Sequence, residues 1–249
     1  ENLSKLISSS PDFLLSEIKK ARTPRWIINI IPDTYRRVII LSDIISWQNE
    51  AKRMVESAGL ARRALIFKPW IISRQEWRAV PPTGNYTSHN PAMITIHHTA
   101  GPQSQSVKDI QKYHMEQRVY IDIGYHYIVD SHANIYDGRP VTVVGAHVET
   151  ENPGNIGVSV IGNYDIVDIT QTQHKAIVEL CAWICNSFGI AAKKISGHRD
   201  FLLANTICPG RFLYARLERI KSEVDEILNP PQIPPSSSSV GWGTPWCCT

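Results

Sequence analysis

The spacing of hydrophobic residues along the chain changes near residue 70. Before this point, apolar residues within 34–59 recur at a mostly helical spacing that closes at Gly59. We therefore expect a helical extension over residues 1–69, which either packs as a small subdomain or binds a partner. Beyond it come short apolar runs with the length of buried strands, separated by turn residues, at 92–97, 124–130, 135–136 and 155–162.

Helical patterns alternate with these strands. Three helices are expected, over residues 104–117, 170–188 and 211–228. Thr170 has a side chain suited to the N-cap of the second helix, and Gly189 stands where a left-handed residue commonly ends one. Strands interleaved with helices predict an α/β domain over residues 70–228. The segment 229–249 contains five prolines and four consecutive serines, which predicts a linker or tail.

Composition narrows the functional classes. The 26 basic and 23 acidic residues leave a net charge of +3, which is too small to predict nucleic-acid binding. No run reaches the roughly 18–20 apolar residues that a membrane span needs, and a hydrophobic content of 43% predicts a globular core. Five cysteines are too few for a disulfide scaffold. Cys181 and Cys185, four positions apart on an expected helix, are expected to be small buried side chains.

Histidine and cysteine residues stand at positions that favour a metal site. His97 and His98 end a predicted strand, from which a side chain can project into a cleft. His198 follows a short polar segment, and Cys208 comes ten positions later. Zinc prefers histidine nitrogen and cysteine thiolate, and a catalytic zinc site uses three protein ligands and leaves one position open. Two histidines and one cysteine meet that requirement.

Five short motifs occur in one order along the chain: Ile96-His97-His98-Thr99-Ala100, Asp122-Ile123-Gly124-Tyr125-His126-Tyr127, Gly145-Ala146-His147, Gly197-His198-Arg199-Asp200 and Thr206-Ile207-Cys208-Pro209-Gly210. This ordered set resembles the zinc-dependent N-acetylmuramoyl-L-alanine amidases, the family that includes the peptidoglycan recognition proteins. The segment Ser73-Arg74-Gln75-Glu76-Trp77 resembles the Ser-Arg-x-x-Trp entry of the recognition-protein branch. The resemblance covers residues 70–228 and implies a central, mostly mixed β-sheet flanked by helices.

The resemblance implies one zinc ion per chain, held by His97, His198 and Cys208. The neighbouring His98 is the alternative to His97 as a ligand. Strand alternation favours His97, since it shares a face with Thr95 while the isoleucines of the same strand face the other side.

Two further residues match catalytic positions of the family. Tyr125 matches a tyrosine whose phenol would hydrogen-bond the zinc-activated water or the tetrahedral oxyanion. Thr206 matches a position held by Lys or Thr in active members and could donate to the oxyanion. The related cytosolic recycling amidases use a glutamate where this chain has Ser159, so the chain groups with the tyrosine-using branch.

The resemblance also implies a groove for the stem peptide. The recognition-protein branch uses a Gly-Trp pair, and an arginine twenty residues after the glycine, to favour stems that contain meso-diaminopimelate. Here Val119–Tyr120 replaces the pair, and Arg139 stands at the matching distance, where it could grip the extra carboxylate or be a solvated turn residue. His147 is expected to line the cleft or to orient a ligand, and His98 and His126 are expected to be substrate-binding residues beside it.

These features together predict a monomeric zinc amidase that hydrolyses the lactyl amide between N-acetylmuramic acid and L-alanine in peptidoglycan or muropeptides. The alternative is a receptor that binds peptidoglycan without cleaving it, a branch in which the cysteine ligand is commonly replaced. Cys208, present here with both histidines, favours the enzyme. Because peptidoglycan lies outside the cytoplasmic membrane, we expect a periplasmic or secreted protein, with a phage-type lysis enzyme made in the cytosol as the alternative.

Overall fold

A mixed six-stranded β-sheet forms the centre of the computed structural model, which describes residues 66–230. Its strands are β1 (Ile71–Ile72), β2 (Met93–His98), β3 (Tyr127–Val129), β4 (Ile135–Asp137), β5 (Asn155–Val160) and β6 (Ile195–Gly197). The order across the sheet is β1-β4-β3-β5-β2-β6, in which β3 and β4 are antiparallel and every other pair is parallel. The predicted α/β class with a mixed sheet is confirmed.

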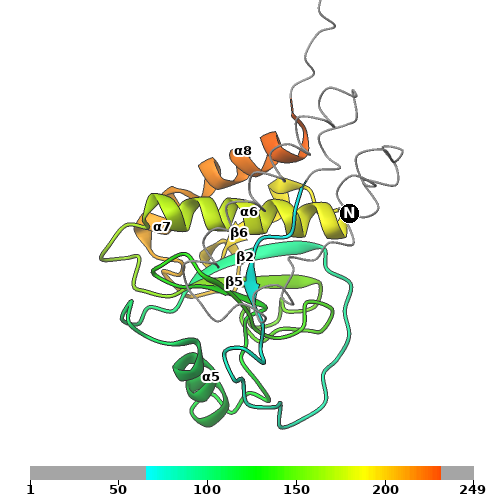
Figure 1. Cartoon of the computed structure of the whole chain (residues 1–249), viewed down its shortest axis with the longest axis vertical. Coiled ribbons are helices and arrows are strands. Elements are labelled where there is room, and N and C mark those ends of the chain that lie inside the picture. Colours follow the sequence, from blue (N-terminus) through cyan, green and yellow to red (C-terminus); the bar gives the residue numbers. More distant parts are fainter. Residues whose placement is uncertain (1–65, 231–249) are drawn as a thin grey trace, which may run out of the picture.

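Helices cover both faces of this sheet. The helices α6 (Gln171–Phe188) and α8 (Leu217–Leu228) lie together on one face, and α5 (Val107–Glu116) lies on the other (Figure 1). Two short 3-10 helices, η2 (Ala192–Lys194) and η3 (His198–Asp200), flank β6. No helix in the described range is long and apolar enough to cross a membrane.

Local sequence signals account for the bounds of α6. The Thr170 side chain accepts a hydrogen bond from the backbone N–H of Gln173, whose own side chain accepts from the Thr170 backbone, so two N–H groups at the helix start are satisfied. At the other end Gly189 adopts φ 68°, and its N–H bonds to the Cys185 carbonyl. The predicted bounds of this helix are confirmed, and Cys181 and Cys185 are buried as predicted.

Two elements differ from the prediction. The final helix is interrupted at Arg216, whose N–H bonds to the Leu213 carbonyl only three residues back, so α7 (Arg211–Ala215) precedes a separate α8. The strand predicted over 124–130 is shortened to β3, because the backbone at Gly124 and Tyr125 bonds outside the strands: the Gly124 N–H donates to a histidine ring, and the Tyr125 carbonyl accepts from the Arg139 N–H. The predictions for residues 1–69 and 229–249 fall almost entirely outside the described residues.

The main hydrophobic core lies between the sheet and the pair α6 and α8. Ile94 and Ile96 of β2 point into it and are fully buried, as are Ile177 and Leu180 of α6. Thr95 and His97, which alternate with those isoleucines, are therefore on the opposite face, as the strand pattern predicted. The side of the sheet that carries α5 is thus the side on which His97 projects.

Replacing Leu180 by alanine should lower the free energy of unfolding by about 2–5 kcal/mol, because the side chain is fully buried in this core and a cavity would remain. Urea denaturation of the purified protein measures the change. Lys175→Ala, one turn earlier on the same helix and exposed, is the matched control and should change stability by less than about 0.5 kcal/mol. Equal losses in the two variants would contradict the assignment of this helix face to the core.

Candidate metal centre and its surroundings

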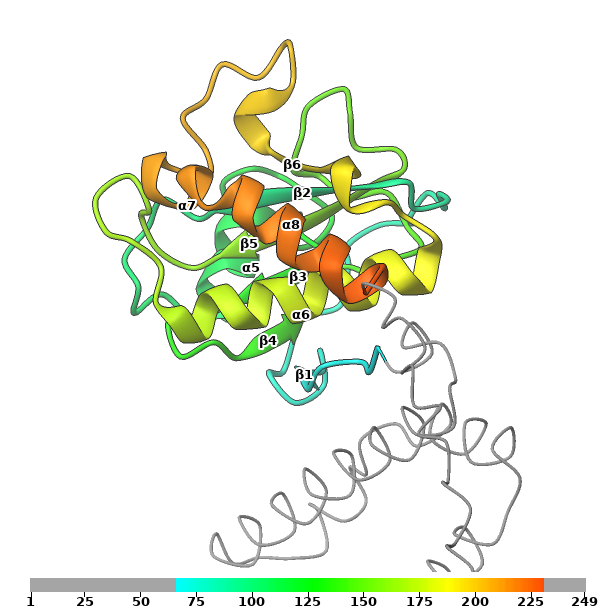
Figure 2. The same ribbon diagram turned by 90° about the horizontal axis from the view of Figure 1, so that it is seen from above.

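Three potential metal ligands converge from different parts of the chain. His97 lies near the carboxyl end of β2, His198 begins η3 directly after β6, and Cys208 lies in the loop before α7. One ligand atom from each of the three lies within 4.8 Å of the others. The parallel pairing of β2 with β6 places His97 and His198 close together. The loop between η3 and α7 extends away from α6 and α8 (Figure 2), and Cys208 lies where this loop comes back to the sheet.

The hydrogen-bond pattern orients the His97 ring. His147 Nε2 lies 3.1 Å from the Asn155 carbonyl, which only accepts, so this nitrogen carries the hydrogen. The other nitrogen, Nδ1, is then an acceptor, and it lies 3.0 Å from His97 Nε2. His97 Nε2 therefore donates, and the lone pair of its Nδ1 faces Cys208 Sγ at 3.7 Å. Burial lowers the pKa of His97 and of His147 well below the ordinary value, which keeps both rings neutral.

A glycine makes room for this arrangement. A Cβ at Gly157 of β5 would lie 2.7 Å from two carbons of the His147 ring, closer than real Cβ contacts allow. The absent side chain lets the His147 ring lie against the strand, in reach of His97. One of the two predicted roles of His147, orienting a ligand, thus has a direct geometric basis.

The Cys208 sulfur is held in a buried environment. The backbone N–H of His98 points at Sγ from 3.4 Å, a contact that favours a negative sulfur. Burial nevertheless raises the pKa of the thiol to about 12, so the sulfur carries its proton at neutral pH until a cation displaces it. Two neutral imidazoles and one ionisable thiol are the nitrogen and sulfur donors that zinc prefers, and the set leaves an open position.

The His98 side chain, the alternative ligand, is directed elsewhere. Its Nδ1 accepts a hydrogen bond from the Tyr164 backbone N–H at 3.2 Å, and it is not among the three residues whose ligand atoms converge. Burial lowers the pKa of His98 to about 4, so the ring is neutral. The alternation of β2 therefore separates the two neighbouring histidines as expected.

Tyr125 and Thr206 both lie at this centre. The Tyr125 ring is 5.2 Å from that of His97, and burial raises the pKa of its phenol, so the group remains a hydrogen-bond donor. The Thr206 hydroxyl oxygen accepts from the Cys208 backbone N–H at 3.1 Å, which leaves its hydrogen free to donate. Ser159 pairs with His97 across β5 and β2, and its buried hydroxyl faces the Tyr125 phenol, whose pKa it lowers against the larger effect of burial.

The other predicted substrate-binding residues differ in how exposed they are and in whether their polar atoms are already hydrogen-bonded. Tyr120 is half-buried, and its ring is 5.5 Å from that of His114. Both ring nitrogens of His126 bond to backbone, one to the Val143 carbonyl and one to the Gly157 N–H. Arg139 is 6% exposed rather than solvated, and its guanidinium donates to three backbone carbonyls.

A buried acid that the sequence analysis did not single out supports the segment that carries Tyr125. Asp122 is fully buried and pairs with Arg74 at 2.9 Å. Its carboxylate also accepts from the Gln111 amide at 2.7 Å and from the Tyr86 phenol. Burial and this carboxylate raise the pKa of Tyr86 to about 12. The signal available in the sequence was Asp122 as the one acid of its motif, together with Arg74 in the Ser-Arg-x-x-Trp segment.

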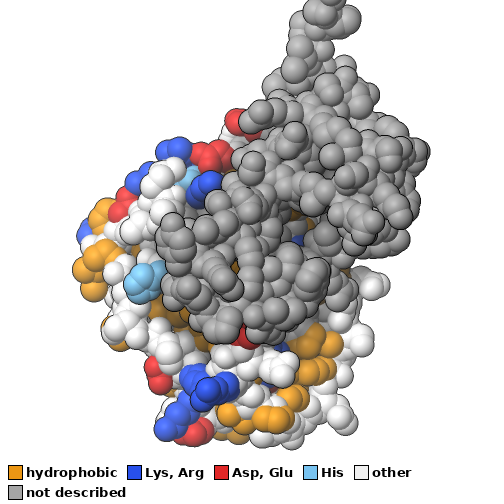
Figure 3. Space-filling view, viewed as in Figure 1, with side chains coloured by type: hydrophobic (Ala, Val, Ile, Leu, Met, Phe, Trp, Pro, Cys, Tyr) orange, Lys and Arg blue, Asp and Glu red, His pale blue; other side chains and the backbone are white. Residues whose placement is uncertain are grey.

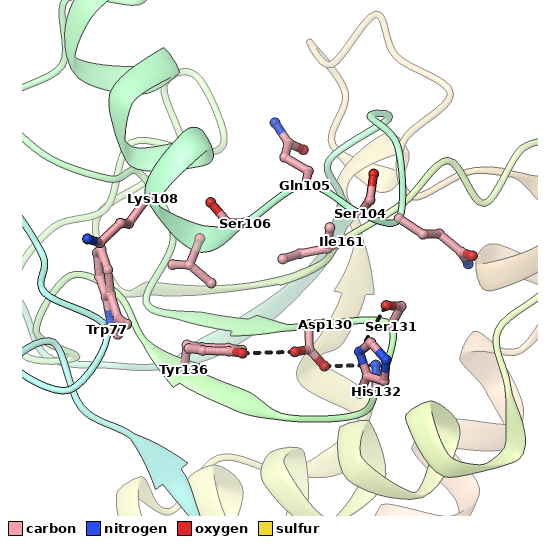
Figure 4. A pocket seen from close by; sticks show the side chains of 12 residues that line it. Trp77, Ser104, Gln105, Ser106, Lys108, Asp130, Ser131, His132, Tyr136 and Ile161 are labelled. Carbon is pink, nitrogen blue, oxygen red and sulfur yellow. Dashed lines mark hydrogen bonds between the residues drawn. The ribbon is translucent and has the colours of Figure 1, made fainter.

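A separate cavity of about 340 Å³ lies beside the start of α5 (Figure 4). Trp77, Tyr136 and Ile161 are among its lining side chains, and none of the predicted site residues lines it. The Asp130 carboxylate at its edge is already occupied by the Tyr136 phenol at 2.8 Å and by the His132 N–H at 2.9 Å. The predicted metal ligands and catalytic residues therefore lie at the metal centre and not at this cavity.

Comparisons with known proteins agree with this geometry. Residues 87–211 match the family described as N-acetylmuramoyl-L-alanine amidase. Peptidoglycan-recognition protein SD of Drosophila simulans is 30% identical over 171 residues, which cover 65% of this chain and 91% of that protein. An endolysin N-acetylmuramoyl-L-alanine amidase of Clostridium intestinale has 26% identity and a TM-score of 0.57, covering 64% of this chain and 97% of that structure.

A second similar structure contains a ligand. It is peptidoglycan recognition protein LE in complex with tracheal cytotoxin, a monomeric diaminopimelic acid-type peptidoglycan. Its identity is 29% and its TM-score 0.55, and the match covers 60% of this chain and 92% of that chain. The similar proteins thus include both recognition proteins and amidases.

Replacing Asp122 by alanine should lower the free energy of unfolding by about 3 kcal/mol, because Arg74 loses its partner and buried donors lose their acceptor. Urea denaturation is again the measurement. Asp168→Ala is the matched control, since the ion pair of Asp168 with Arg216 is more than a third exposed and solvent screening should leave it a much smaller contribution to stability. A loss in Asp122→Ala no larger than in the control would show that the buried pair does not hold this segment.

Proposed function

Because the chain belongs to the N-acetylmuramoyl-L-alanine amidase family, we propose that it is a zinc-dependent hydrolase of the amide between N-acetylmuramic acid and L-alanine in peptidoglycan. The observation that carries the proposal is the convergence of His97, His198 and Cys208, with ligand atoms within 4.8 Å of one another, beside the Tyr125 ring. Three ligands and an adjacent phenol suit catalysis better than a closed structural site, which would use four ligands.

The three residues supply complementary donors to the cation. His97 offers the lone pair of Nδ1, since its Nε2–H is donated to His147. His198 is half-buried, and burial lowers its pKa, so it too is a neutral ligand. Cys208 would bind as the thiolate, with its proton released to solvent, and the His98 N–H would stabilise the negative charge. When bound, zinc supplies a Lewis acid that activates water and polarises the scissile carbonyl.

Tyr125 and Thr206 act on the charge that develops during attack on the amide. The tetrahedral oxyanion needs hydrogen-bond donors already in place. The Tyr125 phenol stays protonated and can donate, and the Thr206 hydrogen is free because its oxygen already accepts from Cys208 N–H. Collapse of the oxyanion requires a proton on the leaving nitrogen of L-alanine, and water within the cleft can relay it.

A receptor without catalysis is the second candidate, since recognition proteins are among the relatives. The observation that favours the enzyme is the chain's own Cys208, buried and directed at His97, because a metal-free receptor has no need of an ionisable thiol there. As peptidoglycan lies outside the cytoplasmic membrane, we propose a periplasmic or secreted location, and action as a monomer on peptidoglycan or muropeptides.

The test combines elemental analysis with muropeptide digestion followed by mass spectrometry on one purified sample. We expect one zinc per chain and release of stem peptides that begin at L-alanine. Cys208→Ala should lose the zinc and the turnover together, whereas Cys185→Ala, a buried cysteine on the opposite face, should keep both. A wild-type protein that binds muropeptides without zinc and without cleavage would instead be a receptor.

Replacing Tyr125 by phenylalanine should leave the zinc content unchanged and reduce kcat by about 10²-fold, because one donor to the oxyanion is lost while the ring packing remains. Initial rates on a soluble muropeptide, measured on zinc-loaded protein, give the ratio. Tyr136→Phe removes a phenol whose partner is Asp130, outside the centre, and is the control. Full activity in Tyr125→Phe would exclude this phenol from the mechanism.

A further inference from the structure

The loop between η3 and α7 presents large apolar side chains to solvent. Leu202 is 99% exposed, Leu203 77% and Ile207 61%. Single exposed hydrophobic residues are ordinary on a protein surface, but a group of them on one loop marks a contact surface. Figure 2 shows that this loop extends away from α6 and α8. We call residues 201–207 the apolar loop.

Hydrogen bonds give the apolar loop a defined shape. The Ala204 N–H donates to the Phe201 carbonyl at 3.0 Å and closes a turn whose two central residues are the leucines. At the ends of the loop, the Arg199 N–H donates to the Cys208 carbonyl at 2.9 Å, and the Arg199 guanidinium donates to the Ile207 carbonyl. The fold itself therefore presents the leucines to solvent.

Leucine is an unusual residue at the two central positions of a turn. Gly, Pro, Asn, Asp and Ser dominate there, because they adopt the turn dihedrals easily or bond to the turn backbone. Leu202 and Leu203 offer neither property, and side chains so exposed add little to the core. Their apolar surface leaves water only when something outside this chain covers it.

Aromatic and basic side chains border the apolar loop. The Arg199 guanidinium lies over the Tyr214 ring at 4.5 Å. Tyr214 is exposed, and its phenol donates to Asp200 at 2.6 Å. The Arg211 guanidinium lies over the Phe212 ring at 4.8 Å. Rings with a polar end, and cations whose stems lie along rings, suit the boundary between lipid headgroups and acyl chains.

Positive charge is concentrated in the segment that contains the apolar loop. Residues 193–216 include five basic side chains and one acidic side chain, a net charge of +4 (5 − 1), whereas the whole chain carries +3. The basic residues are Lys193, Lys194, Arg199, Arg211 and Arg216. Within residues 66–230 only Arg216 of these five forms an ion pair. The segment is therefore suited to an anionic surface.

A second group of basic side chains lacks this excess of charge. Figure 3 shows lysine and arginine side chains, with acidic ones among them, at the end of the molecule where α5 lies. Residues 107–118 contain three basic and two acidic side chains, a net charge of +1 (3 − 2). The apolar loop, and not α5, thus combines exposed apolar side chains with a large excess of positive charge.

We propose that the apolar loop docks this protein on an anionic phospholipid surface. Leu202, Leu203 and Ile207 enter the boundary between headgroups and acyl chains, while Arg211 and the two lysines of η2 attract lipid phosphates. The proposal goes beyond the proposed function and does not depend on it, since binding to lipid requires neither zinc nor peptidoglycan.

Two other occupants fit the apolar loop less well. A second copy of the chain would bring two segments of charge +4 together, and these repel each other. A peptide bound at the metal centre would contact groove walls that pack on the groove floor, whereas Leu202 is almost fully exposed. A lipid surface accommodates both the projecting leucines and the positive charge.

Docking through this loop has a consequence for the candidate metal centre. His198 precedes the loop and Cys208 follows it, so both potential ligands lie at its base. A protein docked in this way holds the centre close to the membrane, which peptidoglycan adjoins.

Co-sedimentation of the full chain with vesicles tests the proposal. Vesicles of phosphatidylcholine are compared with vesicles of an equimolar mixture of phosphatidylcholine and the anionic lipid phosphatidylglycerol. The wild-type protein should bind the mixed vesicles at least tenfold more tightly, because each basic side chain near an anionic surface contributes about fivefold. Equal binding to the two kinds of vesicle, or no binding to either, would overturn the proposal.

Variants locate the contact. Leu202→Ser combined with Leu203→Ser should weaken binding to the mixed vesicles at least tenfold, because less apolar surface leaves water. Val80→Ser combined with Ile227→Ser removes two exposed apolar side chains elsewhere and should leave binding unchanged. Arg211→Gln should weaken binding about fivefold on the mixed vesicles. Unchanged binding in the leucine variant contradicts docking through this loop, even if Arg211→Gln has an effect.

Amide hydrogen exchange on the wild-type protein gives a readout that needs no variant. Mixed vesicles should slow exchange in residues 201–207 severalfold and leave α6 unchanged, and protection confined to other segments refutes the proposal. Sedimentation velocity without lipid tests the second copy as occupant. A dimer that the leucine variant abolishes, together with no vesicle binding, would assign the loop to self-association instead.

Discussion

The candidate centre depends on the position of β2 between two parallel neighbours. Because β2 pairs in parallel with β5 on one side and β6 on the other, the carboxyl ends of all three strands meet at one edge of the sheet. His97 near the end of β2 and His198 just after β6 are thereby neighbours despite their distance in sequence. The fully buried isoleucines that alternate with His97 anchor β2 against α6, so that register cannot slip without moving His97 into the core.

A backbone carbonyl, rather than a further charged side chain, determines which ring nitrogens of His147 and His97 carry hydrogen. The Asn155 carbonyl fixes the hydrogen on His147, and His147 in turn fixes the hydrogen on His97. The lone pair that a cation needs is thus directed by a group that cannot titrate. A neutral pair of rings suits a buried site, because burial makes any imidazolium unfavourable there.

Buried polar side chains in the surrounding segments serve the fold and the site together. Asp122 gathers donors from Arg74, Gln111 and Tyr86, three residues from three separate segments, and Arg139 fastens the Tyr125 and His147 segments to each other. Strand pairing holds these segments only in part, since β3 begins at Tyr127 and, before it, the His126 N–H donates to the carbonyl of Gly157 in β5. Their geometry is therefore maintained by side chain-to-backbone hydrogen bonds together with single backbone contacts, such as the one from the Ala146 N–H to the Gly124 carbonyl.

The sequence by itself determined the α/β class, the capped ends of α6, and the types and order of the candidate ligands, because these follow from local periodicity, capping side chains and short motifs. Alternation along β2 also separated His97 from His98. Only the tertiary structure decided the places of His126 and Arg139, whose ring nitrogens and guanidinium bond to backbone groups distant in sequence. Sequence shows which side chains can donate, but not which carbonyls lie within about 3 Å of them, and the folded packing of loops against the sheet settles that.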